Sequence, residues 1–65
     1  MYRFNVPDMT CGHCASTITR ALKAEDPHAS VEISLREHRV DVESALSAGE
    51  LAQCIVAAGY TPTAA

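Results

Sequence analysis

The order of two apolar periodicities is the feature that most constrains how this chain can fold. The alternation typical of half-buried strands occurs in three segments, residues 2–6, 31–35 and 40–43. Apolar residues recur at helical spacing in two others, residues 14–24 and 51–58. A weak last strand is expected within residues 60–65, where Pro62 restricts it to a sheet edge. The predicted order is therefore strand, helix, strand, strand, helix, strand.

This order is typical of the α+β class and of a ferredoxin-like βαββαβ sandwich, with two helices on one face of a four-stranded antiparallel sheet. Asp26-Pro27 is expected to end the first helix, because the residue before proline avoids the helical region. Ser47 and Glu50 have the spacing of a capping box at the start of the second helix, and Gly59 is placed to end it. Residues 1–65 are interpreted as a single domain.

The small size and acidic balance of the chain exclude several classes of function. A chain of 65 residues buries only roughly 60% of its unfolded surface and leaves little room for an enclosed substrate pocket, so we do not expect an enzyme. Its net charge of -3 disfavours nucleic acid as a partner. It has no apolar run long enough for membrane insertion and no signal peptide. These features predict a cytoplasmic protein, in which thiols stay reduced.

Cys11 and Cys14 stand at Cys-x-x-Cys spacing where the first strand meets the first helix. The partial positive charge of a helix N-terminus favours thiolates, which are the form of cysteine that binds metals. Two soft sulfur ligands select Cu(I), whereas Zn(II) usually takes four ligands. The pattern therefore predicts a metal site at Cys11 and Cys14, with Cu(I) as the first choice.

Other residues have simpler expected roles. His13 lies between the cysteines, where we expect it to face solvent and tune the thiols or, alternatively, to act as a third ligand. Cys54 shares a helical face with apolar residues and is interpreted as a core residue. His28 and His38 fall in connections away from the motif and are expected to be solvated. Arg20 and Lys23 are one turn apart on the outer face of the first helix, where they are either simply solvated or steer the docking of a partner.

The string Met9-Thr10-Cys11-Gly12-His13-Cys14 resembles the Met-x-Cys-x-x-Cys motif of the heavy-metal-associated domain family. The resemblance runs through nearly the whole chain and includes Ile18, Leu22, Val31-x-Ile33-x-Leu35, Val40-x-Val42 and Leu51-x-x-x-Ile55-x-x-Ala58-Gly59-Tyr60. It is strongest to the small bacterial copper chaperones, which pass Cu(I) to copper-exporting P-type ATPases. The resemblance implies that Cys11 and Cys14 are the ligands and that Met9 is a buried anchor. It also implies that Tyr60 lies close to the metal loop, residues 9–14.

The chain departs from the family pattern at Asp8, where glycine is common, and at residues 36–39, where the turn lacks glycine. Thr10 precedes the first cysteine where zinc-handling relatives often carry an acidic residue, which favours copper. Two alternatives stay open: a thiol–disulfide oxidoreductase using Cys-Gly-His-Cys, and a zinc- or mercury-binding relative. A detached domain of a larger transporter is a third interpretation. We expect a monomer without metal and a metal-bridged dimer as a further state.

Overall fold

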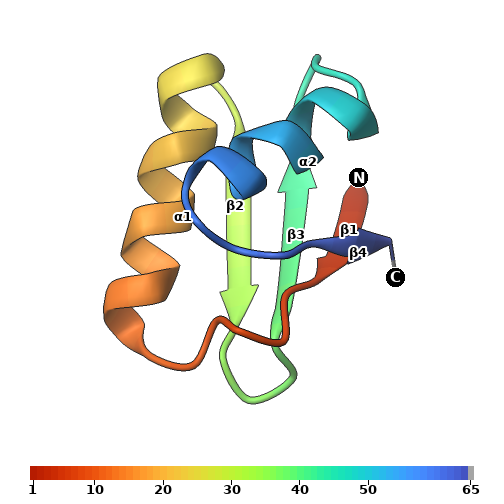
Figure 1. Ribbon diagram of the computed structural model, residues 1–65. Coiled ribbons are helices and arrows are strands. Elements are labelled where there is room, and N and C mark those ends of the chain that lie inside the picture. The colour runs from red at the N-terminus through yellow and green to blue at the C-terminus, as the bar shows by residue number, and fades with distance from the viewer. Residues whose placement is uncertain (65) are drawn as a thin grey trace.

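The computed structural model describes residues 1–64, with side chains through residue 63. Its elements follow the chain as β1 (Tyr2–Asn5), α1 (Gly12–Glu25), β2 (Ser30–Ser34), β3 (Arg39–Glu43), α2 (Ala48–Ala57) and β4 (Thr63–Ala64). The two helices lie together against one face of the sheet (Figure 1). The predicted combination of two helices with an antiparallel sheet is confirmed.

The sheet has the strand order β2-β3-β1-β4, and every pairing is antiparallel. The central strand β3 pairs with β2 through Val31 opposite Val42 and with β1 through Phe4 opposite Val40. β4 contributes two residues at the outer edge of β1, where Thr63 lies opposite Asn5. The three full strands thus form the platform on which the helices pack.

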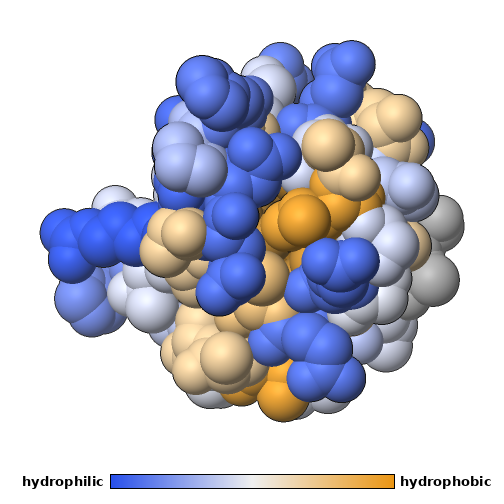
Figure 2. Space-filling view, turned by 90° about the horizontal axis from the view of Figure 1, so that it is seen from above, coloured by the Kyte–Doolittle hydropathy of each residue, from blue (hydrophilic) through white to orange (hydrophobic). Residues whose placement is uncertain are grey.

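The core lies between this sheet and the two helices. Its fully buried side chains come from every layer and are Val6, Met9, Ile18, Leu22, Val40, Val42, Leu51 and Ile55. Removing such side chains from water is the main favourable term in folding, at roughly 25 cal/mol for each Å² of apolar surface. Figure 2 shows the end of the molecule opposite the β1–α1 loop, where hydrophilic side chains surround a small apolar area. Among the described residues, the large apolar side chains that stay exposed are Met1, Tyr2, Leu35 and Val56.

The other face of the sheet is covered by charged side chains. Asp41 at the centre of β3 is only 8% exposed, and its carboxylate accepts a hydrogen bond from Arg3 Nε at 3.0 Å. Arg39 Nε lies 3.5 Å from the same carboxylate oxygen, and its guanidinium also pairs with Glu37 at 2.7 Å. This cluster makes the surface polar on the face of the sheet where no helix packs.

Three details differ from the sequence-based expectations. α1 begins at Gly12 rather than at Cys14, because Cys11 already occupies the N-cap position. Tyr2 is 39% exposed and Leu35 36% exposed, although the alternating patterns predicted a buried face for both. Tyr2 begins the first strand and Leu35 lies beyond the end of β2, so neither position is covered by a helix.

The turn between β2 and β3 lacks glycine and uses His38 in its place. His38 has a φ of 54°, in the left-handed region that few side chains adopt. Gly59 plays the corresponding role after α2, with a φ of 97°. Neither α1 nor α2 has the length and apolar character that a helix needs to cross a membrane, within the part of the chain that the structure describes.

Candidate metal centre

The two cysteines of the motif meet at the N-terminus of α1. Cys11 is the N-cap and is exposed, and Cys14 lies three residues later in the first turn and is half-buried. Their sulfur atoms are 3.3 Å apart and share a hydrogen bond. The helix therefore presents two sulfur atoms side by side at an accessible point, next to the free N–H groups of its first turn.

The surroundings of Cys14 favour its thiolate. The Tyr60 hydroxyl, the Thr10 backbone and the Cys11 thiol favour the charged sulfur by hydrogen bonding and lower the Cys14 pKa from 9.0 to about 7, with Tyr60 as the largest cause. The same hydrogen bond stabilises the neutral phenol and raises the pKa of Tyr60 to about 12. The two shifts agree, because the Tyr60 hydroxyl keeps its proton and donates a hydrogen bond to the charged sulfur.

The position of Tyr60 follows from how α2 ends. Gly59 turns the chain in the left-handed conformation, and the Tyr60 N–H then donates to the Ile55 carbonyl at 3.2 Å. This brings the half-buried Tyr60 to the β1–α1 loop. The expectation that Tyr60 lies close to the metal loop came from the family resemblance, and the contact with Cys14 agrees with it.

Met9 anchors the loop from inside. Its side chain is fully buried among the core residues, and its N–H donates to the Val6 carbonyl at 3.0 Å to close a tight turn. The thioether therefore lies in the core rather than on the exposed surface beside Cys11. A buried anchor is the role that the resemblance implied for this methionine.

Comparison with known families decides where the chain belongs. The family model described as the heavy-metal-associated domain matches residues 3–61, which is most of the chain. The chain belongs to the heavy-metal-associated domain family. The name of the family describes its association with heavy metals, and the paired thiols are the part of this domain best suited to such an ion.

Solved structures of similar proteins agree with this assignment. A gold-binding protein is 37% identical, with a TM-score of 0.96 and 100% of both chains covered. The copper chaperone Atx1 from Synechocystis PCC6803 is 33% identical, with a TM-score of 0.95, over 97% of this chain and 100% of that one. A protein of Agrobacterium tumefaciens is 43% identical, with a TM-score of 0.86, over 94% and 95% of the two chains. A comparison with curated proteins finds no match.

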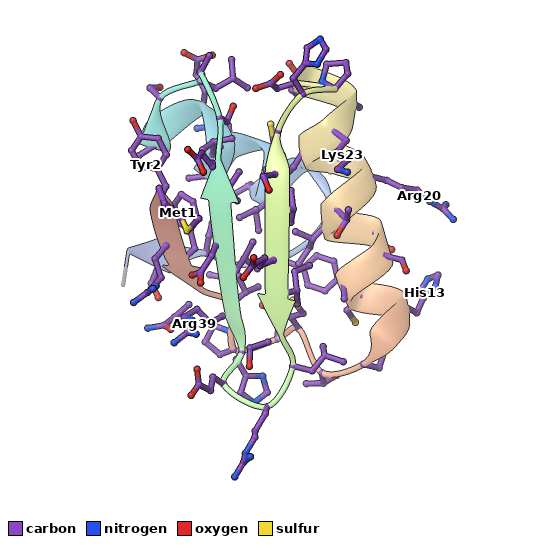
Figure 3. The ribbon with its side chains drawn as sticks, turned by 180° about the vertical axis from the view of Figure 1, so that it is seen from behind. Met1, Tyr2, His13, Arg20, Lys23 and Arg39 are labelled. Carbon is purple, nitrogen blue, oxygen red and sulfur yellow. The ribbon has the colours of Figure 1, made fainter. Side chains whose placement is uncertain are left out.

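His13 of this heavy-metal-associated domain is exposed in the first turn of α1. Figure 3 shows its ring pointing away from the body of the molecule. The expectation that it faces solvent is therefore confirmed. Among residues 1–64, no group of three or more His, Cys, Asp and Glu side chains gathers where a metal ion could bind.

Two contacts near the site were not predicted by the sequence analysis. His38 was expected to be solvated and remote, but this was wrong: its ring Nδ1 lies 2.9 Å from the Met9 carbonyl oxygen. Asp8 accepts a hydrogen bond from the Thr61 N–H at 3.2 Å and so links the metal loop to the segment that carries Tyr60. No local pattern could have indicated either contact, because the partners are 29 and 53 residues apart in the sequence.

Cys54 lies away from the paired thiols. It is buried on α2, and burial is the largest cause of its raised pKa, followed by the charges of Glu25 and Glu50. A thiol in such surroundings stays protonated and behaves as a small apolar side chain. The expectation that Cys54 is a core residue is confirmed.

Proposed function

We propose that this domain binds one Cu(I) ion through Cys11 and Cys14 and transfers it to a partner protein. The observation that carries the proposal is the pair of accessible sulfur atoms 3.3 Å apart, one of which has a pKa of about 7. A cysteine must lose its proton to bind a metal, so a thiol already ionised near neutral pH binds with a smaller proton cost. The metal is cargo, and no chemical reaction of a substrate is involved.

The nature of the two ligands supports Cu(I). Thiolates are soft ligands that select soft ions, and two of them supply only half of a tetrahedral zinc site. The similar solved structures include a copper chaperone and a gold-binding protein, both of them named for metals that bind sulfur strongly. Copper is the cellular cargo that we propose, with zinc, mercury and gold as the ions to be compared with it.

Transfer is supported by the difference in exposure between the two ligands. Cys11 is exposed and Cys14 is half-buried. A thiolate of the partner would form a bond to the metal and give a three-sulfur intermediate. The bond to the exposed Cys11 sulfur would then break first, and this thiolate would take up a proton from solvent. Ligand exchange of this kind never releases a free ion.

We infer a setting for this transfer from the resemblance to bacterial copper chaperones. The acceptor is a copper-exporting P-type ATPase or its metal-binding domain, and the protein acts in the cytoplasm in copper homeostasis. It works as a single domain over residues 1–65, monomeric without metal, with a metal-bridged dimer as a second state. The proposed fold is the complete ferredoxin-like sandwich, in which the short pairing of β4 with β1 represents the fourth strand.

Competitive metal titration tests the proposal. The wild-type protein is expected to bind one Cu(I) per chain in the presence of excess Zn(II), as read by native mass spectrometry. The Cys11→Ser, Cys14→Ser double variant should lose this binding, whereas Cys54→Ser should keep it. Preference for Zn(II) under competition, or unchanged Cu(I) binding by the double variant, would overturn the assignment.

The thiol–disulfide oxidoreductase alternative has one observation in its favour, the short distance between the two sulfur atoms. Against it, Cys14, the thiol whose pKa is lowered, is half-buried. Attack on a disulfide needs a thiolate that is both ionised and accessible. An insulin-reduction assay distinguishes the two functions, since turnover comparable to that of a thioredoxin would support the oxidoreductase.

A further inference from the structure

His38 makes two hydrogen bonds to the segment that leads into the metal loop. Its backbone carbonyl accepts from the Val6 N–H at 2.7 Å, and its ring Nδ1 lies 2.9 Å from the Met9 carbonyl oxygen. Val6 and Met9 are the two ends of one tight turn, closed by the Met9 N–H on the Val6 carbonyl at 3.0 Å. His38 therefore holds both ends of this turn from the opposite side.

The arrangement of the elements explains how a residue so distant in the sequence reaches the loop. The β2–β3 turn and the β1–α1 loop lie at the same end of the molecule, beside each other, in both views of the ribbon (Figures 1 and 3). The left-handed conformation of His38 allows its carbonyl and its ring to face the same segment. Its ring is half-buried there rather than solvated.

The chemistry of the contact fixes where the ring carries its proton. A carbonyl oxygen can only accept a hydrogen bond, so Nδ1 must be the donor. The neutral ring is then the tautomer with hydrogen on Nδ1, which leaves Nε2 without a proton. This assignment follows from the partner alone and can be measured directly.

The Met9 carbonyl belongs to the same peptide unit as the Thr10 N–H, and the Thr10 backbone is one of the causes that lower the pKa of Cys14. The carbonyl and the N–H of a trans peptide are coplanar and point in opposite directions. A donor on the carbonyl therefore fixes the direction of the N–H, and hydrogen bonds in such a chain polarise one another. His38 thus acts on the Met9–Thr10 peptide, which leads directly into Cys11.

We propose that His38 is a positioning residue for the metal centre: by donating from Nδ1 to the Met9 carbonyl, it holds the Met9–Thr10 peptide in the orientation that presents the Thr10 N–H to Cys14. The ring does not bind the metal. It hydrogen-bonds to the backbone of the loop instead. The effect on metal binding rests on the proposed Cu(I) site, but the hydrogen bond itself does not.

Two substitutions of His38 distinguish the effect of its ring from the effect of the backbone turn that carries it. His38→Gly removes the donor but suits the left-handed backbone, so the turn is retained. His38→Asn supplies a side-chain N–H at about the position of Nδ1 and also tolerates this conformation. His28→Gly removes a histidine from an exposed turn after α1 and serves as the matched control.

The first measurement uses the metal-free wild-type protein. Nitrogen-15 NMR of the His38 ring, at alkaline pH where imidazoles are neutral, is expected to show the proton on Nδ1. A ring protonated on Nε2 would overturn the proposal whatever the variants do. This result does not depend on which metal binds, and it stands even if a variant fails to fold.

The second measurement is Cu(I) affinity by competition with a chromophoric Cu(I) chelator, with urea unfolding as the check of folding. His38→Gly is expected to bind about threefold to tenfold more weakly, the effect of one net hydrogen bond. His38→Asn and His28→Gly should stay within about twofold of the wild type. Equal affinity of His38→Gly and wild type, or an Asn variant as weak as the Gly variant, would overturn the proposal. Failure of the wild type itself to bind Cu(I) would instead overturn the proposed function.

Discussion

At the scale of single residues, the pKa of Cys14 is lowered by groups from three parts of the chain. Tyr60 comes from the end of α2, Thr10 from the β1–α1 loop, and Cys11 from the N-cap of α1. At pH 7 a thiol with a pKa of about 7 is about half ionised, whereas one at 9.0 is only about 1% ionised. The fold thus holds much of this sulfur in the thiolate form, which is the form of cysteine that binds metals.

Replacing Tyr60 by Phe is expected to raise the Cys14 pKa toward 9.0. The hydroxyl stabilises the charged form of the thiol, so its loss must move the pKa upward, and the thiolate is then lost at a higher pH than in the wild type. The rate of Cys14 alkylation against pH, read by mass spectrometry, measures the change. Tyr2→Phe on the exposed start of β1 is the control and should leave the profile unchanged. An unchanged profile for Tyr60→Phe would show that the hydroxyl does not contact the sulfur.

What the sequence could predict at this scale depended on whether the contacts were local. Cys11 and Cys14 are three residues apart at a helix start, and that spacing alone predicts that their sulfurs meet. His38 reaches Met9 across 29 residues, and Asp8 reaches Thr61 across 53. Those contacts depend on how β2, β3 and the end of α2 are packed, which no local pattern encodes.

At the scale of elements, the two helices begin in different ways. Ser47 caps α2 with its hydroxyl, which accepts the Glu50 N–H at 3.2 Å and also lies 3.3 Å from the Glu50 carboxylate. This start was predicted from the spacing of Ser47 and Glu50. The Cys11 side chain makes no capping hydrogen bond to the backbone of α1, so no capping residue indicated that start. The N–H groups in the first turn of α1 therefore have no side-chain cap and can face the two sulfur atoms.

Ser47→Ala is expected to destabilise the domain by about 1 kcal/mol, because the first turn of α2 loses its side-chain acceptor. Ser47→Asp keeps an oxygen at the same place and should retain most of the stability. Urea unfolding followed by circular dichroism measures both free energies. An alanine variant as stable as the aspartate variant would mean that solvent replaces the cap at no cost.

A second prediction at this scale concerns the charged side chains of β3, on the face of the sheet where no helix packs. Asp41→Ala is expected to cost about 2 kcal/mol, because Arg3 and Arg39 lose the carboxylate that separates their positive charges. Glu43→Ala, on the exposed end of the same strand, should change the free energy of unfolding by less than about 0.5 kcal/mol. Thermal unfolding at low and moderate salt compares the two variants. Equal losses in the free energy of unfolding would show that the Asp41 cluster does not stabilise the fold.

At the scale of the whole molecule, the metal loop lies at one end and the charged sheet face lies on the side away from the helices (Figures 1 and 3). Arg20 and Lys23 occupy a third surface, the outer side of α1, which is the helix that begins at the paired thiols. Both are exposed, and neither pairs with a carboxylate among the described residues. A protein with a net charge of -3 thus keeps a local positive surface on the helix that begins at the paired thiols.

This surface is expected to steer docking of an acidic acceptor near Cys11. Neutralising it with Arg20→Gln and Lys23→Gln should slow Cu(I) transfer to an acceptor domain several-fold at low ionic strength and weaken the dependence of the rate on salt. The change takes the net charge from -3 to -5, because two positive charges are lost. Ser30→Glu with Ala45→Glu makes the same change at exposed positions off α1. If stopped-flow transfer slowed equally in both double variants, net charge rather than this surface would set the rate. A faster transfer by the α1 variant would mean that the acceptor is positively charged where it docks.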